Sequence, residues 1–422
     1  MKRIILTTML LKLLLVAGCA SFTPVFPDIT ISERVWVDID GNYYSAVQDT
    51  DGDFTIHDVT SGRFFYYRNH NGQIKGRPAG APDIAYKQKN ILLGDKILTS
   101  ANLISERFEI KSDGAIISGL LIMPDSEKKV PVIISGQGSE SSSAIAFDWS
   151  SSWYIQAGYG TVIFDKRGTG SSGGEFTHNF TVLAKDMNTI VEYLLRHPRV
   201  DHNLIGIAGN SQSVRVATLA ASQNPDISFI VASYGTIGTA VDDEMQLTKK
   251  KFNDQYPELS WSDFSPFVMS CISAFALEQD EHWSIIEEEK AHWLSLLDPD
   301  KLEGTQVGDG CLSWPIFILK SFGRSKLPSG LDWSYDPSLD IESLNIPIMW
   351  LFGEADDVAP SEASIRKVKS WITKGKPFEV KTYEGANHGM YLLGGNETVG
   401  TYRYKHPQYI KDIINWLIEL KN

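Results

Sequence analysis

Three residues that are far apart in the sequence carry the side chains needed for nucleophilic catalysis. Ser211, Asp356 and His388 each follow a short apolar run that has the pattern of a strand. A serine hydroxyl is a poor nucleophile near neutral pH. It becomes reactive when a histidine takes its proton and an aspartate orients and stabilises that histidine. The three residues therefore predict acyl transfer through a covalent intermediate on Ser211.

Ser211 lies where the sequence changes from a strand pattern to a helix pattern. Leu204–Asn210 is short and mostly apolar, and a stretch rich in Ala and Val follows the serine. A sharp turn at this position, a nucleophile elbow, projects the hydroxyl above the end of a sheet. The pattern G-x-S-x-G, typical of such a turn, is complete except that Ser213 replaces the last glycine. Because Ser213 and Val214 are larger than glycine, we expect a looser or shifted contact between the strand and the helix.

The expected acid and base come later in the chain, in the order Ser, Asp, His. Asp356 stands three residues after Gly353, in the turn that leaves a strand, and this placement favours it over its neighbour Asp357. His388 is in the loop immediately after a late core strand, whereas His406 begins the final helix. We therefore expect Asp356 to orient His388, and His388 to act as the base.

An oxyanion hole requires backbone N–H groups directed at the developing negative charge. One is expected from Gln212, the residue after the nucleophile. The other is expected from Gln137, because Gly136 allows a turn after the strand Val130–Ser135. A tight strand-to-helix turn with no catalytic role would give the same glycine-rich sequence.

Strands that alternate with helices from residue 105 onwards predict a mostly parallel central sheet with helices on both faces. The alternation stops between about 238 and 335, where amphipathic and aromatic stretches predict an inserted helical cap. The aromatic residues of the cap could line a substrate pocket or form the core of the cap. Residues 19–104 contain alternating runs and Asp-Gly turns, which predict a small antiparallel β-rich region and a linker.

The amino-terminal segment has the pattern of an export signal. Lys2 and Arg3 precede the apolar run Ile4–Val16, and small residues then precede Cys19. This pattern predicts a signal peptide over residues 1–18. The cysteine after the small residues resembles the lipobox of bacterial lipoproteins. That resemblance implies a lipid on Cys19 and an exported protein anchored in the cell envelope, with its folded part facing the periplasm. The alternative is an ordinary signal peptide with an incidental cysteine.

The net charge and the number of cysteines limit which ligands and cross-links the protein is expected to have. The net charge of −13 becomes more negative when residues 1–18, which hold three basic and no acidic residues, are removed. Such an acidic protein is not expected to bind nucleic acid. Cys271 and Cys311 remain, and they could form a disulfide after export or stay as buried thiols. The sequence has no cluster of cysteines and histidines that would indicate a metal site. The predicted chemistry also requires no cofactor.

The chain from about 105 to 422 resembles the α/β-hydrolase superfamily, especially its bacterial branch related to dienelactone hydrolases, acyl-CoA thioesterases and prolyl oligopeptidases. The resemblance depends on Pro131–Gly138, Gly158–Gly174, Gly206–Ala221, Pro347–Pro360 and Tyr383–Gly389. The chain departs from these relatives at Ser135, where they usually carry histidine, and at Ser213 and Val214, where glycines are frequent.

The resemblance implies a serine hydrolase of the carboxylesterase type that acts on a small-molecule ester or acyl substrate. The alternatives are a serine peptidase or acyl-thioester hydrolase of the same fold, and a non-catalytic lipoprotein that binds a ligand through the cap.

Overall fold

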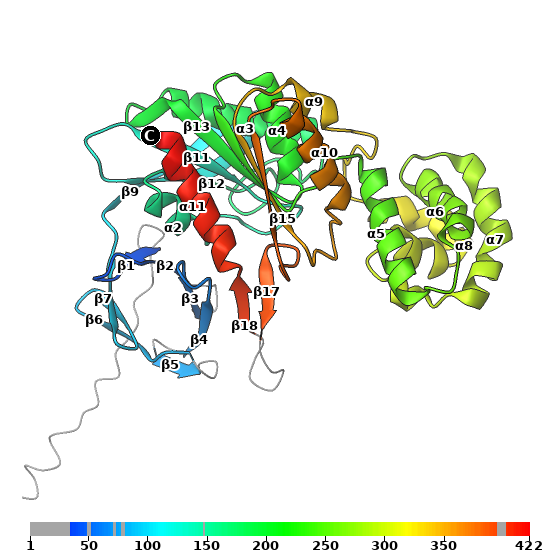
Figure 1. Ribbon diagram of the computed structural model, residues 1–422, viewed down its shortest axis with the longest axis horizontal. Coiled ribbons are helices and arrows are strands. Elements are labelled where there is room, and N and C mark those ends of the chain that lie inside the picture. The colour runs from blue at the N-terminus through cyan, green and yellow to red at the C-terminus, as the bar shows by residue number, and fades with distance from the viewer. Residues whose placement is uncertain (1–33, 49–51, 71–72, 77–80, 147, 395–401) are drawn as a thin grey trace, which may run out of the picture.

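The computed structural model describes residues 34–422 except 49–51, 71–72, 77–80, 147 and 395–401. The predicted signal peptide and Cys19 lie outside the described residues. Figure 1 shows an amino-terminal sheet, a central sheet covered by helices, and a helical lobe at one side. In the part of the chain that is described, no helix is both long and apolar enough to span a bilayer.

The amino-terminal region is one antiparallel sheet of eight strands in the order β5-β4-β3-β2-β1-β8-β7-β6. Its strands are β1 Val35–Val37, β2 Tyr43–Gln48, β3 Phe54–Asp58, β4 Phe64–His70, β5 Gln73–Gly76, β6 Ile84–Lys87, β7 Asn90–Leu93 and β8 Lys96–Ser100. Trp36, Tyr44, Phe54 and Tyr67 fill its own small core. This confirms the expected antiparallel β-rich region.

The central sheet has the strand order β16-β15-β14-β13-β11-β12-β10-β9. Its strands are β9 Leu103–Ser112, β10 Ala115–Pro124, β11 Val130–Gly136, β12 Gly160–Phe164, β13 Val200–Asn210, β14 Phe229–Ser233, β15 Ile348–Gly353 and β16 Phe378–Tyr383. Strands β11 to β16 are parallel to one another, whereas β10 pairs antiparallel with β9 and β12. The carboxyl ends of the parallel strands meet at one edge, and this edge carries the candidate catalytic residues.

Helices cover both faces of the central sheet, as a parallel sheet requires. One face carries α3 Phe180–Leu195, α4 Ser213–Gln223, α9 Ser338–Ser343 and α10 Glu362–Thr373, and the other carries α2 Ser151–Gln156 and α11 Pro407–Lys421. In α3 the apolar residues Met187, Ile190, Val191 and Leu194 recur at helical spacing, and all four are buried. The mostly parallel sheet predicted from the sequence is confirmed.

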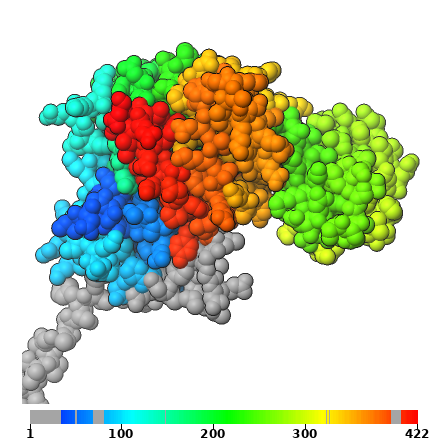
Figure 2. All heavy atoms as spheres, viewed as in Figure 1, coloured from blue at the N-terminus to red at the C-terminus, as the bar shows by residue number. Residues whose placement is uncertain are grey.

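The segment between β14 and β15 forms the helical lobe, which Figure 2 shows to one side of the rest of the molecule. It contains α5 Ala240–Gln255, α6 Trp261–Phe275, η2 Asp280–His282, α7 Trp283–Leu296, η3 Pro299–Leu302, η4 Val307–Leu312, α8 Ile316–Phe322 and η5 Gly323–Lys326. Phe264, Phe267 and Trp293 pack in the core of the lobe, so these aromatic residues build the cap and do not line the site. A disulfide between Cys271 and Cys311 joins α6 to η4.

A final strand pair connects the central sheet to the amino-terminal sheet. β17 Tyr391–Gly394 and β18 Tyr402–Lys405 are antiparallel, and they follow the loop that carries His388. The N–H of Lys405 donates to the carbonyl of Gly62 at 2.9 Å. Gly62 has a φ of 71°, and a Cβ there would lie 2.0 Å from the Lys405 carbonyl oxygen, so only glycine fits.

Candidate active site

Ser211 occupies a sharp turn between the end of β13 and the start of α4. Its φ of 50° is in the left-handed region, which a serine rarely adopts. Its N–H donates to the carbonyl of Ser233 at 2.9 Å, and its own carbonyl accepts from the N–H of Val214 at 3.0 Å. Such a conformation costs about 1–3 kcal/mol and persists only where its surroundings impose it. The predicted elbow is therefore present in the structure.

The three residues proposed for catalysis lie within hydrogen-bonding distance of one another. Nε2 of His388 is 3.1 Å from Oγ of Ser211, and Nδ1 of His388 is 2.9 Å from Oδ2 of Asp356. Asp356 is only 4% exposed, and its other oxygen accepts hydrogen bonds from the N–H groups of Val358 and Ala359. Asp357 is exposed to solvent, so the structure distinguishes the two neighbouring aspartates.

Contacts between loops fix the histidine relative to the aspartate. The N–H of Ala355 donates to the carbonyl of Ala386 at 3.0 Å, which links the two loops. A Cβ on Gly353 would lie 2.4 Å from the same carbonyl oxygen, so the glycine allows this close approach. On the other side, the ring of Tyr234 packs edge-on against the His388 ring, with the centroids 5.1 Å apart.

The residues expected to form the oxyanion hole are adjacent in space. Gln212 stands immediately before α4, where the first N–H groups of a helix have no acceptor within the helix. Gln137 follows β11, and its carbonyl accepts a hydrogen bond from the hydroxyl of Ser213. The ammonium of Lys166 donates to the carbonyl of Gly138 at 2.6 Å and so supports the same loop. The two proposed donors therefore belong to neighbouring segments beside the nucleophile.

The sequence predicts a looser or shifted contact between β13 and α4, and the looser contact is not found because the two elements lie close together. A Cβ on Gly209 would lie 2.6 Å from the carbonyl oxygen of Ser213, so the strand and the helix approach as closely as their backbones allow. Val214 fits because its neighbour is Gly235, where a Cβ would lie 2.5 Å from the Val214 side chain. Gly235, which follows β14, therefore provides the space that the larger side chain of Val214 needs.

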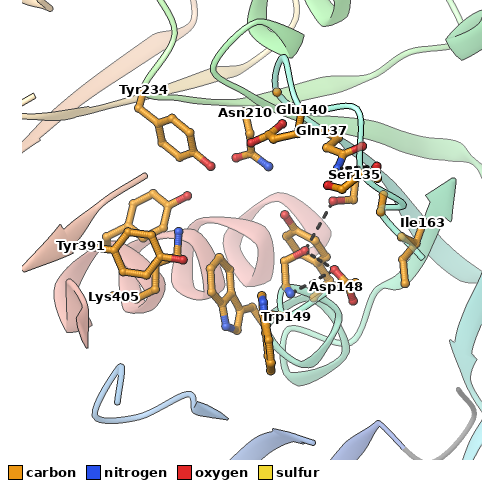
Figure 3. Close-up of a pocket in the computed structure, with 17 residues that line it drawn as sticks. Ser135, Gln137, Glu140, Asp148, Trp149, Ile163, Asn210, Tyr234, Tyr391 and Lys405 are labelled. Atoms are coloured by element: carbon orange, nitrogen blue, oxygen red, sulfur yellow. Dashed lines mark hydrogen bonds between the residues drawn. The ribbon is translucent and has the colours of Figure 1, made fainter. Parts of the chain in front are cut away.

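Two cavities flank the triad. The first, of about 250 Å³, is lined by Ser211 and His388 together with Glu244 and Trp333 from the helical segment. The second, of about 260 Å³, opens on the side of α2 and the β17–β18 pair (Figure 3). Tyr234 lines both cavities. A substrate bound at Ser211 therefore has space on either side of its reacting carbonyl.

Burial shifts the pKa of several ionisable groups around these cavities, among them one carboxylate and two lysines. It raises the pKa of Glu244 to about 7, because the carboxylate is withdrawn from water. It lowers the pKa of Lys166 to about 8 and that of Lys405 to about 7. Sequence reasoning missed Glu244 and Lys405, since nothing in an amphipathic helix or a short strand marks which charged residue is buried. Among the described residues no group of three or more His, Cys, Asp or Glu side chains could hold a metal ion.

Comparisons with known proteins agree with this architecture. The family model of the X-Pro dipeptidyl-peptidases (S15 family) matches residues 113–285, which is less than half of the chain. Polyketide transferase af380 of Aspergillus fumigatus is 30% identical over 111 residues, which make up 26% of this chain. The matched region spans only 37% of that relative.

Solved structures with a similar backbone fold include the α/β-hydrolase GrgF from a Penicillium species. It is 18% identical, with a TM-score of 0.42 over 68% of this chain and 91% of GrgF. The esterase Pf2001 of Pyrococcus furiosus is also 18% identical, with a TM-score of 0.42 over 68% of this chain and 83% of the esterase. These likenesses are too distant to bear on the reaction.

The strand order of the central sheet is that of the α/β-hydrolase fold, and the partial family match agrees with it. The reaction that the chain catalyses is a separate question, and it depends on the site.

Proposed function

We propose that the protein is an exported serine hydrolase that cleaves a carboxylic ester through an acyl-enzyme intermediate. The observation that carries the proposal is the continuous chain of hydrogen bonds from Ser211 through His388 to Asp356, with Ser211 held at a positive φ. Strained backbone positions of this kind cluster at functional sites, and here the strained residue also carries the hydroxyl that contacts His388.

The proposed reaction has two steps. Oγ of Ser211 attacks the ester carbonyl while Nε2 of His388 takes the hydroxyl proton. The bond to the alcohol then breaks, and the alcohol leaves with that proton. A water molecule gives a proton to His388 and attacks the acyl-serine. The bond between the acyl carbon and Oγ of Ser211 then breaks, His388 returns the proton to Oγ, and the carboxylic acid leaves. Asp356 stabilises the protonated histidine, and the N–H groups of Gln137 and Gln212 stabilise the oxyanion in both steps.

A fluorophosphonate probe tests the nucleophile directly. We expect it to label the wild-type protein and not the Ser211→Ala variant, with both proteins showing the same circular dichroism. Absence of labelling in folded wild-type protein would overturn the proposal.

A serine peptidase is the second candidate, and the partial match to the S15 peptidase family is the observation that favours it. A set of p-nitrophenyl esters and a set of aminoacyl and prolyl p-nitroanilides separate the two candidates. Faster turnover of the anilides, compared as kcat/KM, would replace the esterase proposal by the peptidase proposal.

Export and lipidation form a further part of the proposal, based on the charged start, the apolar run and Cys19. Mass spectrometry of the mature amino terminus in a bacterial host tests it. We expect cleavage before Cys19 and a lipid-modified cysteine, and an unmodified Met1 would contradict both.

A further inference from the structure

Lys405, at the end of β18, is a buried cation for which the described part of the chain provides no carboxylate partner. The residue is 7% exposed, and its ammonium group donates to the carbonyl of Gly389. Its remaining close neighbours are aromatic faces. The ammonium nitrogen is 4.3 Å from the ring centroid of Tyr391, 5.7 Å from that of Tyr234 and 5.9 Å from that of Tyr409.

An ammonium group has three N–H donors, and one of them is used by Gly389. Aromatic faces attract a cation but replace its hydration only in part. Burial without a paired carboxylate lowers the pKa of Lys405 to about 7. An anion close to the ammonium would supply the missing acceptor and favour the charged form.

The second cavity gives an anion room to reach Lys405. Figure 3 shows Lys405 and Tyr391 on one wall and Asn210 with Gln137 on the wall that faces them. The side chain of Asn210 adds amide donors to this space. Glu140 also lines the cavity. It is exposed, and its charge acts on Lys405 and partly offsets the effect of burial on the pKa of Lys405.

The second cavity borders the machinery proposed for catalysis. Asn210 immediately precedes Ser211, Gln137 is a proposed oxyanion donor, and Tyr234 packs against His388. A chemical group attached to the carbonyl that reacts with Ser211 can therefore extend into this space. The cavity volume of about 260 Å³ suits a short chain with a polar end.

We propose that this second cavity is a subsite for a carboxylate on the acyl part of the substrate, held by the ammonium of Lys405 and the amide of Asn210. The favoured substrates are then half-esters of short dicarboxylic acids, in which one carboxyl group is esterified and the other is free. This inference rests on the proposed esterase function and specifies its substrate class.

A matched pair of esters tests the subsite. Mono-p-nitrophenyl adipate carries a free carboxylate, and p-nitrophenyl heptanoate replaces that carboxylate by an ethyl group. After subtraction of the uncatalysed rates, we expect kcat/KM of the wild-type protein to be about tenfold or more higher for the adipate, as for a charge-assisted hydrogen bond. Equal rates, or a preference for heptanoate, would overturn the subsite proposal and leave the esterase proposal intact. If instead neither ester is hydrolysed and the fluorophosphonate probe does not label Ser211, the esterase proposal is overturned.

Lys405→Met removes the charge and keeps an unbranched side chain that is only one atom shorter. Because Lys405 also holds the carbonyl beside His388, the variant is expected to lower both rates, and the ratio of the two rates is the informative quantity. We expect the ratio to fall to about one, whereas Lys411→Met, on the exposed side of α11, keeps the wild-type ratio. An unchanged ratio in Lys405→Met would contradict the role of the ammonium.

Competition in the wild-type protein provides a test that needs no variant. We expect the hexanoate anion to slow fluorophosphonate labelling of Ser211 about tenfold more effectively than neutral hexanamide at equal concentration. Equal protection by the two compounds would argue against an anion subsite.

Discussion

The hydroxyl of Ser213 donates a hydrogen bond to the backbone carbonyl of Gln137, and so connects the first residue of α4 to the loop after β11. The peptide plane of this carbonyl also contains the N–H of Gly138, and the N–H of Gln137 lies in the plane before it, so the bond restricts how this loop can turn. The serine that departs from the usual glycine of the elbow thus positions the loop proposed to bind the oxyanion.

We predict that Ser213→Ala lowers kcat about tenfold or more and leaves KM nearly unchanged, because a misplaced donor weakens mainly the transition state. Steady-state kinetics on p-nitrophenyl esters measure the effect. Ser222→Ala, in the last turn of the same helix, is the control and should leave kcat within about twofold of wild type. An unaltered kcat in Ser213→Ala would show that the loop keeps its place without this hydrogen bond.

We predict that Asp356→Asn lowers kcat by about 10³–10⁴-fold, because an amide favours the wrong tautomer of His388 and does not stabilise its charged form. Asp357→Asn is the matched control. Its side chain is exposed, so we expect kcat within about twofold of wild type. Comparable losses in the two variants would reassign the acid.

We predict that the free energy of unfolding depends on pH through ionisation of the Glu244 carboxyl group. This carboxylate accepts hydrogen bonds from the N–H of Gln306 at 2.6 Å and the hydroxyl of Thr248 at 3.1 Å, and Asp243 and Asp309 add negative charge nearby. Burial raises its pKa from 4.5 to about 7. Its stabilising contribution is therefore complete below pH 4.5 and is lost as the pH rises through about 7.

Glu244→Gln keeps an acceptor for Gln306 and cannot ionise. We expect it to be more stable than wild type by about 1–3 kcal/mol at pH 8 and to show little difference at pH 4.5, as measured by urea unfolding. Glu288→Gln, on the exposed face of α7, should show no such pH dependence. A constant difference between Glu244→Gln and wild type at both pH values would refute the assignment.

The disulfide closes a segment of 40 residues within the helical lobe. Replacing both Cys271 and Cys311 by Ala should destabilise the lobe by about 2–4 kcal/mol, because its unfolded chain gains conformational freedom. Hydrogen exchange followed by mass spectrometry should show faster exchange in α6 and α7 and unchanged exchange in β11 and β13. Uniform acceleration throughout the chain would show instead that lobe and sheet unfold as one unit.

The sequence predicts the sheet well, because its strands are apolar runs separated by helices with regular apolar spacing. It also predicts which serine, aspartate and histidine meet, since each follows a strand and parallel strands end at one edge. It does not predict that Ser213 holds Gln137, because that bond depends on how closely α4 approaches β11. Burial of Lys405 is equally absent from the sequence pattern, because it results from β18 packing against aromatic residues of α2, α11 and the loop after β14.

The pairing of Arg63 with Tyr404 and of Gly62 with Lys405 joins segments from nearly opposite ends of the chain. Contacts of such long sequence separation form late, because the intervening chain must first be ordered at an entropic cost. The wall of the second cavity is therefore completed only after translation has passed residue 405. On the proposed export route, the chain would cross the membrane before this wall is complete and would form it on the far side.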